Sequence, residues 1–170
     1  VFKSVDNGNN WTLVRPALGT TKITFDPVSA STVYLAVTNE GVLKSTDNGQ
    51  TWTLRNQGLR IFSATRIVID PLKPSTLYVS SSAQGNQSDA FVTKINPTGS
   101  ALIYSTLISG TPQPGGPGSL TAFDIAVDSA GSAYITGLGG SQFETTPNSY
   151  QPFNRGGDDV FIIKLTMSHI

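Results

Sequence analysis

The sequence predicts an all-β chain built from repeated antiparallel units, and three observations carry this prediction. A ten-residue pattern at positions 3–12 recurs 41 positions later at 44–53. A strand pattern that ends in Asp-Pro at 22–27 recurs 44 positions later at 66–71. Charged residues make up only 13% of the 170 residues, while Ser, Thr, Asn and Gly are plentiful, which is typical of short-strand, turn-rich proteins. Long helices are therefore not expected.

The ten-residue pattern predicts a strand, a tight turn and a second strand. Its Asp-Asn-Gly core favours a turn because Asn and Gly tolerate positive φ. The side chains of Asp6 and Asp47 can then accept hydrogen bonds from backbone N–H groups a few residues further on. We expect Trp11 and Trp52, which follow the two turns, to be large apolar plugs between neighbouring sheets.

The spacing Ser-x-Asp-x-Gly-x-x-Trp resembles the Asp-box (BNR) repeat of sialidase-like and sortilin-like β-propellers. In that family the box lies on the turn between the third and fourth strands of a blade, away from the binding face. The resemblance therefore implies a structural role more than an activity. The residues that carry it are Ser4, Asp6, Gly8 and Trp11 in the first copy, and Ser45, Asp47, Gly49 and Trp52 in the second.

These turns define the first two repeat units. Residues 1–14 form half a unit, and residues 15–58 form a complete one. In the complete unit, alternating residues predict a strand at 22–25 that stops at an Asp-Pro pair. The run 32–37 is rich in β-branched and aromatic residues, so it is expected to be a central, buried strand.

The next two units repeat the plan without the Asp-Asn-Gly turn. Residues 59–110 form one unit, in which Asn-Pro-Thr-Gly replaces that turn. The Pro- and Gly-rich segment 111–118 cannot pair in a sheet and is expected to be an exposed loop. Residues 111–170 then form an incomplete unit, whose final strand at 159–165 matches 89–95 at an offset of 70.

From Asp89 onward the segments 89–106, 126–137, 145–151 and 156–165 look like the SBBP repeats of bacterial secreted β-propeller proteins. The two resemblances together imply a β-propeller-type repeat of four-stranded antiparallel blades, about three of them present, as part of a larger propeller or assembly. Four lysines mark the same position in successive units: Lys3, Lys44, Lys94 and Lys164.

Catalysis is not expected. A glycosidase needs two carboxylates facing each other across the bond, and the only glutamates, Glu40 and Glu144, have no such context. Asp26, Asp70 and Asp128 recur at one repeat position and are interpreted as turn acceptors at strand ends. With no cysteine and one histidine next to the end of the chain, thiol and His-triad chemistry are excluded. We predict no enzymatic activity and no cofactor.

Binding residues are sought in the connections between strands. Asp158 and Asp159 lie side by side in a Gly loop and are the candidates for a metal site, although the missing EF-hand spacing favours a solvated turn. Loop aromatics could stack on sugar rings or pack against a neighbouring blade. The candidate ligand-binding residues are Arg60, Phe143, Tyr150, Phe153 and Arg155.

We expect a non-catalytic, secreted or cell-surface module with a structural, self-assembling or protein-binding role, as a filament or a multi-subunit complex. Its expected partners are additional blades, copies of itself, an extracellular protein or a glycan. Balanced charge, 11 basic and 11 acidic residues, disfavours nucleic acid, and no segment is apolar enough for membrane insertion. The alternative is a lectin-like, glycan-binding propeller or one associated with a glycoside hydrolase. A ring needs about four blades or more, so an isolated closed monomer is not expected.

Overall fold

The computed structural model describes residues 1–16, 19–57, 59, 64–82, 90–96, 101–108, 120–140, 145–153 and 156–166. Within these residues all regular structure is β, as predicted, and every strand pair is antiparallel. The described residues contain no helix long and apolar enough to cross a membrane.

The strands form four sheets, each with its strands side by side in chain order. The first sheet contains β1 (Phe2–Lys3) and β2 (Thr12–Leu13). The second contains β3 (Thr20–Phe25), β4 (Val33–Val37), β5 (Gly41–Ser45) and β6 (Thr53–Leu54). The third contains β7 (Ala64–Ile69), β8 (Leu77–Ser82), β9 (Ala90–Ile95) and β10 (Leu102–Ile108). The fourth contains β11 (Leu120–Val127), β12 (Ala133–Gly139) and β13 (Asp159–Leu165).

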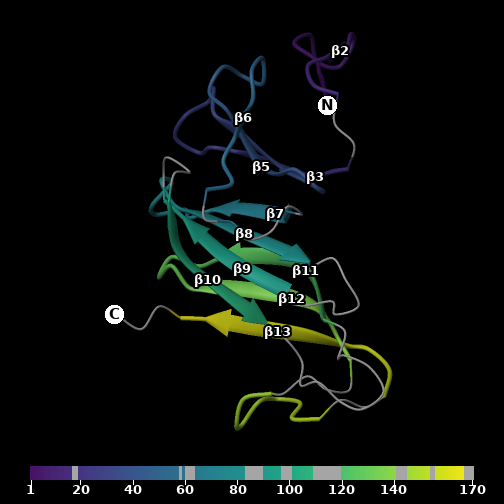
Figure 1. Ribbon diagram of the computed structural model, residues 1–170, viewed down its shortest axis with the longest axis vertical. Helices are drawn as coiled ribbons and strands as arrows, with labels where there is room; N and C mark the ends of the chain where they lie inside the picture. Colours follow the sequence, from purple (N-terminus) through teal and green to yellow (C-terminus); the bar gives the residue numbers. More distant parts are fainter. Residues whose placement is uncertain are drawn as a thin grey trace.

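The sheets follow one another through the molecule in sequence order, from the N-terminus at the top of Figure 1 to β13 near the bottom. Their first strands lie next to each other, since β3 contacts β7 and β7 contacts β11. Each of these first strands also carries a bulge at the same point of its pairing with the second strand, after Thr20, Ala64 and Ala122. Bulges increase local twist, so the three first strands are twisted at equivalent positions.

The core consists of apolar layers between successive sheets. Tyr34 and Ala36 of β4 point into the layer shared with the third sheet, while Leu35 and Val37 point into a cluster on the opposite face. All five residues of β4 are therefore buried, as the run of apolar residues predicted. A second layer between the third and fourth sheets contains Tyr78, Ala90, Val92, Leu120, Ala122, Ile125, Ala133, Ile135 and Phe161.

Candidate functional site

The two Asp-Asn-Gly turns have the same internal geometry. In the second turn the Gly49 N–H donates to Ser45 Oγ at 2.8 Å, and the Ser45 hydroxyl donates to Asp47 Oδ1 at 2.7 Å. The matching bonds in the first turn join Gly8, Ser4 and Asp6. As predicted, the Asn and Gly residues have positive φ, 58° and 82° in the second turn and 58° and 89° in the first.

The turn carboxylates are held as anions by these donors. Bonds from the backbone N–H and side chain of Asn10 and the hydroxyl of Ser4 lower the pKa of Asp6 to about 2. The hydroxyl and backbone N–H of Thr51 hold the pKa of Asp47 still further below its ordinary value. Both carboxylates are thus engaged inside their own turns.

The two indoles differ although their motifs match. Each donates its ring N–H to the glycine carbonyl of its own turn, at 3.0 Å for Trp11 and 3.1 Å for Trp52. Trp52 is half-buried against the cluster that contains Leu35 and Leu43, but Trp11 is 62% exposed. The expectation that both indoles plug a space between sheets is therefore wrong for Trp11. The described first sheet contains only β1 and β2 and offers no such apolar cluster.

The aspartates at the ends of the first strands are turn acceptors, as predicted. Asp26, Asp70 and Asp128 each accept a hydrogen bond from the backbone N–H two residues further on, at 2.9, 3.0 and 2.9 Å. Asp128 also accepts a bond from the Tyr134 hydroxyl and lies 3.8 Å from the Lys164 ammonium. The carboxylates therefore stabilise the turns at one end of each of the three larger sheets.

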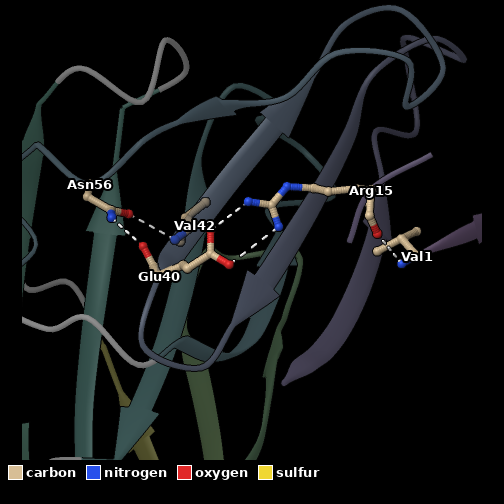
Figure 2. Close-up of polar contacts among 5 residues, drawn as sticks. All are labelled: Val1, Arg15, Glu40, Val42 and Asn56. Atoms are coloured by element: carbon tan, nitrogen blue, oxygen red, sulfur yellow. Dashed lines mark hydrogen bonds and ion pairs between the residues drawn. The ribbon is translucent and has the colours of Figure 1, made fainter. Parts of the chain in front are cut away.

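A polar cluster joins the connections at the opposite end of the second sheet (Figure 2). The Arg15 guanidinium pairs with the Glu40 carboxylate in the turn between β4 and β5. Just after β6, the side-chain amide of Asn56 donates to the Glu40 carbonyl at 2.6 Å and accepts from the Val42 N–H at 2.9 Å. The Val1 ammonium donates to the Arg15 carbonyl. No sequence pattern predicted this cluster, because Arg15 and Glu40 are 25 residues apart.

The predicted loop residues are placed only in part. Tyr150 and Phe153 are strongly exposed, while Arg60, Phe143 and Arg155 lie outside the described residues. Asp159 accepts a bond from the Gln151 amide at 3.2 Å, and Asp158 is exposed. The described part of the chain contains no group of three or more His, Cys, Asp or Glu side chains that could hold a metal ion.

A lysine lies over a tyrosine ring in each of the three larger sheets. The distances from ammonium to ring centre are 5.3 Å for Lys44 and Tyr34, 5.1 Å for Lys94 and Tyr78, and 5.1 Å for Lys164 and Tyr134. In every case the two residues are direct partners across the second and third strands of the sheet. The repeat pattern identified the lysines as equivalent positions, but it did not predict that each lies over a tyrosine. The segment between the two residues differs in length from sheet to sheet.

One face of the fourth sheet carries large apolar side chains that no described residue buries. On this face Val160 is 74% exposed and Ile162 is 72% exposed. The residues 70 positions earlier in the third sheet, Ala90 and Val92, are 0% exposed because the fourth sheet packs on them. We call the exposed surface around Val160, Ile162 and Tyr134 the free face.

Comparison with known proteins supports one architecture. A family model described as a beta-propeller repeat (SBBP) matches residues 103–144. A GH74 enzyme of Niastella koreensis matches 79% of this chain with 23% identity and a TM-score of 0.57. A GH74 xyloglucanase of Xanthomonas campestris matches 95% with 17% identity and a TM-score of 0.61. No curated protein sequence matches this chain significantly.

The chain has a β-propeller-type fold. It spans only 21% and 25% of the length of the two solved enzymes, so their likeness concerns the propeller architecture. The second, third and fourth sheets correspond to blades, and their adjacent first strands are the innermost strands of those blades. The free face of the fourth blade is the face that, in the second and third blades, is covered by the next blade.

Proposed function

We propose that this chain is a non-catalytic β-propeller module, secreted or at the cell surface, that binds further blades or copies of itself within a larger assembly. The proposal rests on the exposure of apolar side chains on the free face. Its Val160 and Ile162 occupy repeat positions that are fully buried in the third blade. Large apolar side chains exposed together on one sheet face are typical of interaction sites.

The state of the carboxylates supports a role without catalysis. Asp6 and Asp47 are engaged in their turns, and Glu40 is paired with Arg15. Acid–base hydrolysis of a glycosidic bond uses two carboxyl groups on either side of the substrate. The low proportion of charged residues and the many Ser, Thr, Asn and Gly residues support a turn-rich extracellular module.

Light scattering across a wide range of protein concentrations tests this proposal. We expect concentration-dependent association, because covering the free face removes apolar surface from water. Ile162→Lys should abolish the association by placing a charge in the contact. Val28→Lys is the matched control, since Val28 is also strongly exposed, at 78%, but lies in the turn after β3. A stable monomer at every concentration would contradict self-association.

A glycan-binding or glycoside-hydrolase-associated propeller is the second candidate function. The two solved relatives are GH74 enzymes, and one of them is a xyloglucanase. In this chain Tyr150 and Phe153 present exposed rings that could stack on sugars. Xyloglucan is therefore the first ligand to try, with binding and release of reducing sugar measured separately. Saturable binding that is lost in Tyr150→Ala would favour this candidate over the assembly module.

A further inference from the structure

We infer that the free face selects a particular partner, namely a further propeller blade whose first two strands are joined by a short, glycine-containing turn. The residue that recognises this turn is Tyr134, whose hydroxyl donates to the glycine carbonyl. The inference rests on the proposed function and specifies the partner. The contact between the third and fourth blades already contains the same arrangement.

Tyr78 provides that precedent. It is 0% exposed, lies beneath Lys94, and donates its hydroxyl to the Gly131 carbonyl at 2.9 Å. Gly131 belongs to the turn between β11 and β12 of the following blade. Its φ of +79° is a conformation that suits glycine. The tyrosine and the glycine turn thus meet closely across the boundary between two blades.

The boundary between the second and third blades differs in the length of the turn. Tyr34 has the same place in the second blade and faces the third blade, in which the turn between β7 and β8 is closed by a bond from the Asp70 N–H to the Thr76 carbonyl. The turn after β11 is two residues shorter, because its closing bond joins Asp128 to Ser132. In the described residues 70–76 no group accepts a hydrogen bond from Tyr34. The bond across the boundary therefore accompanies the short turn.

Tyr134 is the equivalent residue on the free face. Its hydroxyl donates to Asp128 Oδ2 of its own blade at 3.1 Å, and Lys164 lies over its ring. Asp128 would keep other partners if the hydroxyl turned away, because its Oδ1 accepts the N–H groups of Ala130 and Ser132 at 2.9 and 2.8 Å. Exchange of one acceptor for another leaves neither group unpaired. The Tyr134 hydroxyl can therefore move to an incoming carbonyl.

The apolar and polar parts of the free face then have separate roles. Val160 and Ile162 supply the area that any blade would cover, which is non-directional. The Tyr134 hydroxyl supplies direction, since a hydrogen bond depends on distance and angle. A blade with the short glycine turn gains this bond and a blade with the longer turn does not. Because the new bond replaces the bond to Asp128, the expected preference is at most about 10-fold, the size of one neutral hydrogen bond.

The test places a second copy of residues 109–166 after residue 166, in place of residues 167–170, so that Tyr134 faces an added 128–132 turn. Native-state hydrogen exchange measures how often the added blade undocks. Tyr134→Phe and replacement of the added turn by the sequence of residues 70–76 should each weaken docking, by up to about 10-fold. Combined, the two changes should do no more than either alone, since both remove the same bond. Tyr134→Phe in the unextended chain is the control for the bond to Asp128.

The outcomes separate this inference from the proposed function. Protection of the β13 amides by the added blade, with non-additive effects of the two changes, supports both. If the added blade protects the β13 amides but neither change alters this protection, selection by Tyr134 is overturned. The free face then remains an interaction site. Additive effects also overturn it, because they assign the two changes to different contacts. No protection of β13 overturns both.

Discussion

Shortening the side chain at one repeat position in two different blades gives the sharpest test that the free face is uncovered. Val92 in β9 and Ile162 in β13 are equivalent, yet they are 0% and 72% exposed. Val92→Ala removes two buried carbon groups at about 0.8 kcal/mol each and leaves a cavity, so it should lower the free energy of unfolding by about 2–3 kcal/mol. Ile162→Ala removes more atoms, but from an exposed surface, and should stay within about 0.5 kcal/mol.

Urea unfolding at sub-micromolar protein concentration, followed by tryptophan fluorescence and far-UV circular dichroism, measures both changes. The comparison is matched in position, because each variant replaces a β-branched residue with alanine in the third strand of a blade. Equal destabilisation by the two variants at the lowest concentration would refute the reasoning. A cost for Ile162→Ala that grows with protein concentration would instead indicate that the free face becomes covered by association.

Three further predictions concern the turns and the polar cluster. Trp52→Ala should lower the free energy of unfolding by about 2 kcal/mol and Trp11→Ala by clearly less, because only Trp52 is packed against the second sheet; equal losses in denaturant melts would contradict this difference. Asn56→Ala should cost about 1–3 kcal/mol, since the Val42 N–H loses its acceptor; a neutral result in the same melts would mean that water replaces the amide. The pKa of Asp47 is depressed in the folded state, so its stabilising effect is complete above the ordinary Asp pKa of about 4 and is lost as the pH falls below it. Asp47→Asn should therefore show a flatter decline of stability with acid than the wild type, and parallel pH profiles would exclude this linkage.

The sequence alone determined the local architecture. The Asp-Asn-Gly turns are specified within ten residues, since Asn48 and Gly49 adopt positive φ and the Asp47 carboxylate bonds to groups only three and four residues away. Asp26 and Asp70 were likewise identified as turn acceptors from their place after a strand. The alternation of apolar residues was sufficient for the strands, and the repeat spacing was sufficient for their grouping into sheets. All of these features depend on contacts between neighbours in the chain.

Only the tertiary structure decided which side chains are covered. Trp11 and Trp52 have the same motif and the same bond to their own turn, but one is exposed because burial depends on the sheet beneath. Val92 and Ile162 differ for the same reason. Arg15 pairs with Glu40 across a separation that no periodicity marks. Burial and ion pairing are properties of surfaces that meet in space, and a repeated sequence presents the same surface whether or not another blade lies against it.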